Sequence, residues 1–267
     1  DLLPGDGEAS LPPLIELVRR MKKQGAARDE ILLAAAREVA GAYVPRFYQP
    51  RYNADGTLAG MDVLAEGVPG VVPHVHLRNL SDSPAIVRPL VPLAEAVHER
   101  VVIEIMRGCP NACRFCQAGH ARLPVRMRSV DEIVRIARET LAATGFDEVS
   151  LLSLSSSDYP RLDELIDRLN AEFAQRRVSV SLPSLRVGSQ LQQLPRLTSA
   201  VRKGGLTIAA EAGSERLREA IRKDIRESDM IDAVQAAYRS GWRSVKVYFM
   251  AGLPGESEQD IDEIYRL

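Results

Sequence analysis

The three cysteines of this 267-residue sequence, Cys109, Cys113 and Cys116, fall within one short segment. Their spacing is CxxxCxxC, and they come directly after a predicted strand. Soft sulfur ligands suit iron–sulfur chemistry. Three thiolates can hold three irons of a four-iron cluster and leave the fourth iron open. Because an open position on a metal can bind a substrate or cofactor directly, this spacing indicates a catalytic cluster.

His120 offers a second use of the same cysteines. Together with the three thiols it completes a Cys3His set, which is typical of a closed zinc site. A structural zinc usually staples a small module. Here the cysteines follow the first strand of a longer series, at the end where α/β folds place their active sites. Both metals stay open on the spacing alone, and the position favours iron and sulfur.

The composition excludes several classes of protein. Apolar residues make up 45% and charged residues 27%, which is typical of a globular protein. The 35 basic and 36 acidic side chains nearly cancel, so a generally basic nucleic-acid binder is not indicated. No stretch reaches the ~18 apolar residues of a membrane helix, and we expect no membrane partner. A clustered, odd set of cysteines without an export signal indicates a reducing, cytoplasmic location.

The elements that must position the cysteines form an α/β series. Apolar strands alternate with helices, and we expect these strands over residues 101–107, 148–154, 178–182, 206–211 and 244–250. Repeats of roughly 36 residues suit βα units of a parallel sheet. Ser129 and Ser257 each open a helix with a capping box. The sequence therefore predicts three parts: a helical segment over 1–42, an extended linker with a small β element over 43–100, and the main domain over 101–267.

At the cysteines the sequence resembles the radical S-adenosylmethionine (SAM) superfamily. Phe115, just before the last cysteine, completes that superfamily's CxxxCxΦC pattern, and the resemblance covers about residues 95–267. It implies a partial (βα)6 parallel barrel, truncated at the C-terminus. It also implies a [4Fe–4S] cluster on Cys109, Cys113 and Cys116, with Phe115 packed beside it. SAM would then be cleaved reductively to a 5′-deoxyadenosyl radical, with an electron from a flavodoxin- or ferredoxin-like donor.

Further stretches are similar to the superfamily's SAM-binding elements. Ser155, Ser156 and Ser157 stand where the family often has a GGE-like stretch that meets the SAM amino group. Glu211 and Ser214 belong to a stretch similar to the ExGSxxxL element near the ribose, and Gly252 opens a G-x-P-x-E turn that borders the adenine. Arg186 would hold a carboxylate or the ribose; a solvated surface arginine explains it equally well.

The proline-rich segment with Tyr43-Val44-Pro45 and the Arg107-Gly108-Cys109 sequence resemble the branch of the superfamily with an N-terminal cobalamin-binding domain. The corrinoid-ligating D-x-H-x-x-G is absent, so such a domain, and any bound cobalamin, would lie mostly before Asp1. Methylthiotransferases are the nearest rival. They carry a second cluster on upstream cysteines, and residues 1–108 contain none. RNA is one candidate for the substrate.

Polar side chains alternate with apolar ones along the last three predicted strands. Since successive side chains of a strand point to opposite faces, one face is apolar and the other polar. We expect the polar face to line a lumen that holds SAM and substrate; the residues are Ser179, Ser181, Thr207, Glu211, Lys246 and Tyr248. An exposed sheet edge would give the same pattern. Five arginines and one acid between residues 104 and 128 give a local surplus of positive charge. It would serve the cluster and SAM, an acidic donor or RNA; a solvated patch beside a helix explains it equally well.

Overall fold

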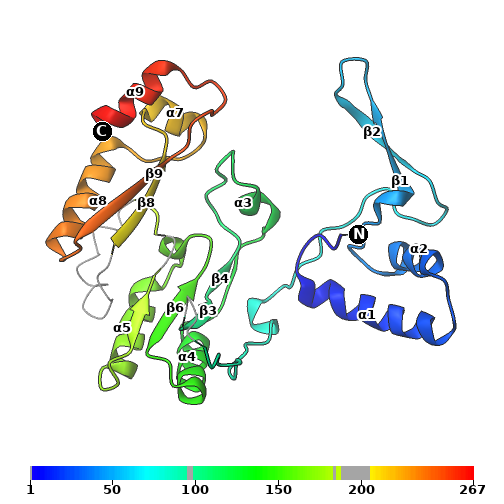
Figure 1. The fold of residues 1–267 in the computed structure, drawn as a ribbon, viewed down its shortest axis with the longest axis horizontal. Helices are drawn as coiled ribbons and strands as arrows, with labels where there is room; N and C mark the ends of the chain where they lie inside the picture. Colours follow the sequence, from blue (N-terminus) through cyan, green and yellow to red (C-terminus); the bar gives the residue numbers. More distant parts are fainter. Residues whose placement is uncertain (1, 95–98, 183–184, 188–204) are drawn as a thin grey trace. The chain divides into compact units, whose positions relative to one another are not determined.

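The computed structural model describes residues 2–94, 99–182, 185–187 and 205–267. The chain divides into two compact units, Asp1–Arg78 and Asn79–Leu267 (Figure 1). The predicted boundaries at 42/43 and 100/101 stay predictions. In the part of the chain that is described, no helix combines the length and the apolar character that a membrane crossing requires.

The first unit combines two helices with a hairpin. Helices α1 (Gly7–Lys23) and α2 (Arg28–Glu38) pack through buried apolar side chains that include Leu17 and Val39. After a 3-10 turn, η1 (Pro45–Phe47), strands β1 (Tyr48–Tyr52) and β2 (Leu58–Val63) pair antiparallel. Asp55 accepts hydrogen bonds from the backbone and hydroxyl of Thr57, which is how an aspartate stabilises a tight turn. The small β element predicted around Asp55 is confirmed.

The second unit has strands in all five predicted ranges, although the first range, 101–107, is interrupted at Ile105. Strands β3 (Val101–Glu104), β6 (Glu148–Leu152) and β7 (Ser179–Ser181) form a parallel sheet in the order β3-β6-β7. Strands β8 (Gly205–Glu211) and β9 (Ser244–Phe249) form a parallel pair. No strand pairing links these two sheets within the described residues, so the structure is a mixed α/β fold and the (βα)6 barrel stays a prediction. The helix expected between β7 and β8 falls on 188–204, outside the described residues.

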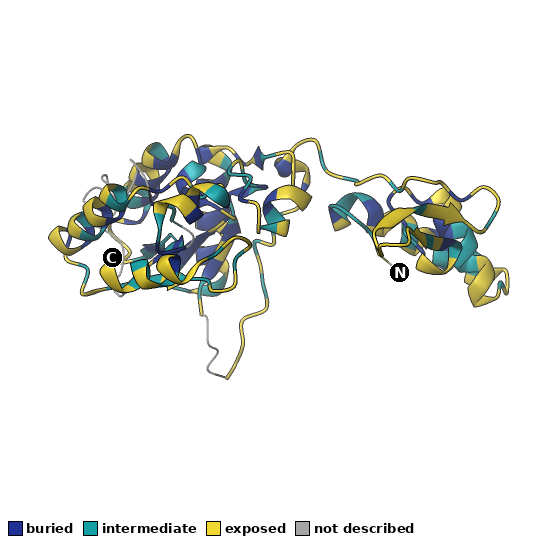
Figure 2. Cartoon of the chain, turned by 90° about the horizontal axis from the view of Figure 1, so that it is seen from above, coloured by how far each residue is buried: buried dark blue, intermediate teal, exposed yellow. Residues whose placement is uncertain are grey.

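Helices of the second unit pack on the strands through their apolar faces. Helix α4 (Val130–Thr144) begins where the Ser129 hydroxyl accepts the Glu132 N–H, and it ends at Gly145, whose φ of +76° is the left-handed cap conformation. Its buried face joins α5 (Leu162–Phe173) and α8 (Glu227–Arg239) in one core with the strands. Figure 2 shows buried residues along β3, β6 and β8, whereas the residues of β9 are exposed or half-buried.

The alternation along β8 and β9 is confirmed. Leu206, Ile208 and Ala210 are buried in the core, whereas Lys246 and Tyr248 are exposed. The apolar residues of β9 pack, half-buried, against the same core. The polar phase therefore faces away from the packed helices; that it lines a lumen stays a prediction.

Candidate functional site

The cysteine loop, residues 108–125, is closed at its base by a short antiparallel ladder. Strand β4 (Met106–Arg107) pairs with β5 (Arg126–Met127). Gly108 follows with a φ of +89°, and a Cβ there would lie 2.7 Å from the Arg122 carbonyl oxygen. Only glycine fits such a close backbone approach. The ladder and Gly108 together fix where the loop leaves the sheet.

Each cysteine has a distinct environment within the cysteine loop. Cys113 is buried, and Cys109 and Cys116 are half-buried. The Asn111 side-chain amide donates to the Cys109 sulfur at 3.4 Å, and the Gly119 N–H donates to the Cys116 sulfur at 3.3 Å. The latter bond caps the N-terminus of α3 (Gln117–Ala121). Thiolates that bind an iron–sulfur cluster accept hydrogen bonds from N–H groups of this kind.

The three thiols are soft sulfur donors, and by this chemistry they fit an iron–sulfur cluster. Among the described residues, no group of three or more His, Cys, Asp or Glu side chains is arranged to hold a single metal ion. A [4Fe–4S] cluster offers each thiolate its own iron, so its ligands need not converge on one ion. A Cys3His zinc requires four groups at one ion. His120 Nε2 instead lies 3.2 Å from the Cys113 carbonyl oxygen.

The cysteine loop is tied to the turn that follows β6. The Asn111 amide donates to the Asp158 carboxylate, at the end of η3 (Ser156–Asp158). The three predicted serines of this turn are buried. The Ser156 hydroxyl contacts that of Ser153 at 2.9 Å, and the Ser157 hydroxyl accepts the Arg186 backbone N–H at 3.1 Å.

The carbonyls of the same turn are also engaged. The carbonyls of Ser155 and Ser156 accept N–H groups from Asp158 and Tyr159 at 3.1 and 3.2 Å. Arg186 is half-buried, and its backbone joins this turn through Ser157. The structure thus brings four predicted SAM-site residues together. The Ser156 and Ser157 hydroxyls and the Ser155 and Ser156 carbonyls form hydrogen bonds within the protein.

Glu211 ends β8 at an irregularity. The pairing register shifts between Ala209 and Glu211, and Glu211 has a φ of +72°. Such bulges re-aim a side chain and are frequent beside active sites. The Glu211 carboxylate is 14% exposed and its Oε1 lies 3.0 Å from the Lys223 Nζ.

Ser214 caps α7 (Glu215–Ala220), accepting the Leu217 N–H at 3.2 Å. Its hydroxyl proton goes to Asp260, a buried residue of α9 (Glu258–Arg266), so Ser214 can offer a ligand one lone pair only. Hydrogen bonds from Ser214, Ser257 and Arg216 lower the pKa of the Asp260 carboxyl below its ordinary value. Asp260 therefore fixes the cap of α7 to the start of α9.

The turn after β9 closes on itself. The Glu256 carboxylate accepts the Gly252 N–H, and Gly252 has a φ of +87°. The predicted G-x-P-x-E stretch is thus a compact turn that follows the end of β9.

Most arginines around the cysteine loop bind the protein itself. Arg107 pairs with Glu104, Arg128 with Glu132, and Arg126 donates to nearby carbonyls. The predicted basic patch is therefore smaller than the sequence indicates.

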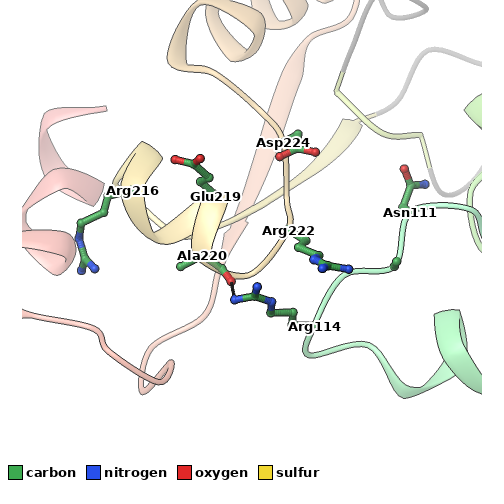
Figure 3. A pocket seen from close by; sticks show the side chains of 8 residues that line it. Asn111, Arg114, Arg216, Glu219, Ala220, Arg222 and Asp224 are labelled. Atoms are coloured by element: carbon green, nitrogen blue, oxygen red, sulfur yellow. Dashed lines mark hydrogen bonds between the residues drawn. The ribbon is translucent and has the colours of Figure 1, made fainter.

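A groove of about 700 Å³ lies between the loop and α7 (Figure 3). Arg114 and Arg222 extend into it, and Arg114 donates to the Ala220 carbonyl at 2.7 Å.

Sequence reasoning missed the residues that join the parts of this site. Asn111 and Lys223 were not singled out, and neither were the β4–β5 ladder and the contact of Asp260 with Ser214. Asn111 lies inside the cysteine segment, which was a signal for it. The partners of the other residues are distant in sequence, and one sequence gives no sign of such contacts.

Comparison with known proteins assigns the second unit. A sequence model described as the radical SAM superfamily matches residues 103–267. The uncharacterized protein MJ0966 of Methanocaldococcus jannaschii is 40% identical over 166 residues, which cover 62% of this chain and 36% of that protein. A tRNA-2-methylthio-N(6)-dimethylallyladenosine synthase of Opitutus terrae is 28% identical over 184 residues, 62% of this chain and 37% of that enzyme.

A solved structure shares the fold over nearly the whole chain. It is the cobalamin-dependent SAM radical enzyme OxsB with aqua-cobalamin and SAM bound. The TM-score is 0.58 at 15% identity, with 99% of this chain and 35% of OxsB covered. The chain therefore spans about a third of the length of the proteins that it matches.

Proposed function

We propose that this chain, which belongs to the radical SAM superfamily, carries the superfamily's cofactor site on its cysteine loop. Cys109, Cys113 and Cys116 bind three irons of a [4Fe–4S] cluster, and SAM binds at the fourth. When bound, these cofactors supply the reductive cleavage of SAM to a 5′-deoxyadenosyl radical. One observation carries the proposal: the cysteine loop is hydrogen-bonded both to the turn after β6 and to the end of α7, which follows β8. Elements that follow three strands thus contact one another.

The chain's own residues prepare this site in several ways. The Asn111 amide and the Gly119 N–H donate to the Cys109 and Cys116 sulfurs, and such bonds tune the potential of a cluster. Phe115 is 40% exposed, an apolar side chain left available to pack beside the cluster.

Four further elements form the proposed SAM site. Glu211 accepts the ribose hydroxyls, and Ser214 adds its remaining lone pair. The Gly252 turn borders the adenine. The buried turn at Ser155, Ser156 and Ser157 presents its carbonyls to the SAM amino group, and Arg186 holds a carboxylate.

The wider reaction is proposed from the relatives. A second candidate is methylthiotransfer or methylation of RNA or protein, and the similarity to the tRNA-modifying synthase supports methylthiotransfer to RNA. The likeness to OxsB supports cobalamin bound by another part of a longer protein. A one-electron donor of the flavodoxin or ferredoxin type completes the system, in a reducing cytoplasm.

Anaerobic reconstitution with iron and sulfide tests the proposal. The protein should take up about four irons per chain, the content of one [4Fe–4S] cluster. With a chemical reductant present, it should form 5′-deoxyadenosine from SAM. The variant with alanine at all three cysteines should do neither, because the sequence has no other cysteine. If that variant keeps iron and still cleaves SAM, the proposal is wrong. If His120→Ala releases zinc from the purified protein, the site is a zinc module.

A further inference from the structure

A short stretch of chain, residues 220–223, contacts both the cysteine loop and Glu211; we call it the bridge segment. The Arg114 backbone N–H donates to the Ile221 carbonyl at 3.0 Å, and Arg114 Nη1 donates to the Ala220 carbonyl at 2.7 Å (Figure 3). Two residues later, Lys223 Nζ lies 3.0 Å from Glu211 Oε1. The bridge segment therefore joins two parts of the proposed SAM site that are about a hundred residues apart in sequence.

The backbone on both sides of this ion pair has an unfavourable conformation. Arg222, directly before Lys223, has a φ of +57°, and Glu211 has a φ of +72°. Residues other than glycine, asparagine and aspartate rarely adopt these φ values. Strain of this kind persists only where surrounding contacts enforce it, and it is concentrated at functional sites. Here it turns Lys223 back toward Glu211.

The surroundings hold both partners in place. The side chains of Lys223 and Glu211 are 12% and 14% exposed. The Lys223 N–H donates to the Arg218 carbonyl at 2.8 Å. The buried Arg218 guanidinium donates to the carbonyls of Ala212 and Gly213, directly after Glu211. Because desolvation offsets the attraction of a buried ion pair, such a pair is a poor source of stability and is better suited to fixing a geometry.

We propose that Lys223 is a positioning residue for Glu211. It holds Oε1 and so orients Oε2 toward the SAM ribose, while the bridge segment sets the distance from Glu211 to the cysteine loop. Among the described residues, Lys223 is the hydrogen-bond donor found at this carboxylate. This inference rests on the proposed function, because it assumes that Glu211 contacts SAM.

The test measures SAM affinity and cluster content separately. The full chain, anaerobically reconstituted, is compared with Lys223→Met, Lys223→Arg and the control Lys23→Met, which removes an exposed lysine of α1. Lys223→Met should weaken equilibrium binding of SAM by about 10- to 100-fold, as removal of an orienting group does elsewhere. Its iron and sulfide content should equal that of the parent. Lys223→Arg should restore most of the affinity, and Lys23→Met should change nothing.

A double-mutant cycle separates positioning from a structural role. Lys223→Met leaves a buried carboxylate without its partner, which can destabilise the fold. In Glu211→Gln this carboxylate charge is absent. The effect of Lys223→Met on SAM affinity can therefore be measured in that variant without leaving an unpaired carboxylate. If Lys223 acts through Glu211, adding Lys223→Met to Glu211→Gln leaves SAM affinity unchanged. An equal further loss in that background overturns the inference, as does parent-like affinity in Lys223→Met.

The electron paramagnetic resonance spectrum of the reduced cluster gives an independent readout. SAM should shift it in the parent at concentrations that leave Lys223→Met unshifted. If the parent itself neither binds SAM nor shows a shift, the proposed function fails. If the parent binds SAM and the Lys223 variants match it, only the positioning role fails.

Discussion

Replacing Gly108 with alanine should destabilise the protein through two separate costs. At its φ of +89°, an L-residue loses about 1–2 kcal/mol relative to glycine. The new Cβ would also lie 2.7 Å from the Arg122 carbonyl oxygen and 3.0 Å from that of Pro124. Both atoms belong to the backbone and cannot rotate away, so overpacking adds about 1–3 kcal/mol. The free energy of unfolding should therefore fall by about 2–5 kcal/mol.

Gly145→Ala is the matched control. Gly145 has a φ of +76°, but nothing lies within 4 Å of a Cβ built there, so this variant carries only the conformational cost. Urea denaturation of the two variants should differ by about 1–3 kcal/mol, the steric part alone. Iron uptake should fall in Gly108→Ala, since the base of the cysteine loop must shift beside Cys109, and stay normal in Gly145→Ala. Equal unfolding midpoints for the two variants would refute this reasoning.

Three further variants probe elements around the site. Ser129→Ala removes the cap of α4 and should cost about 1 kcal/mol in chemical denaturation, with no change in iron content. Arg222→Gly relieves a left-handed residue and should leave stability equal or raise it by up to about 1 kcal/mol; a clear loss would show that the arginine side chain contributes more than the strain costs. The pKa of Asp260 lies below its ordinary value of 3.8, so its stabilising effect is complete above that value and is lost as the pH falls below it. Unfolding followed by acid titration should therefore depend less on pH, between about pH 4 and pH 2, in Asp260→Asn than in the parent.

Local chemistry made most of the fold predictable. The five strands of the second unit follow from short apolar segments, the last three of which also alternate with polar side chains. The ends of α4 follow from Ser129 and Gly145. The Asp55 turn is equally local. In each case the signal and the structure that it specifies lie within a few residues of each other. The closure of a barrel depends on pairings between distant strands, which one sequence does not reveal.

The candidate site was predictable in its residue types and less so in its contacts. The cysteine spacing, Phe115 and the Gly252 turn are continuous motifs. The hydroxyl of Ser214 illustrates the limit: its proton is given to Asp260, 46 residues further along the chain. Lys223 illustrates it again, because its partnership with Glu211 depends on a strained turn at Arg222. Such contacts arise only after the sheets and helices have packed.

Helix α7 has only six residues, fewer than an isolated helix needs to persist in water. Its ends are held by other segments: Asp260 binds the capping Ser214 at one end, and Arg114 binds the Ala220 carbonyl at the other. Local opening of either contact removes support for the whole helix. Its amide protons should therefore exchange with solvent at a rate set by the cysteine loop and α9 together. Helix α7 contains no predicted metal ligand. Hydrogen exchange of its amide protons should nevertheless report loss of order in the cysteine loop.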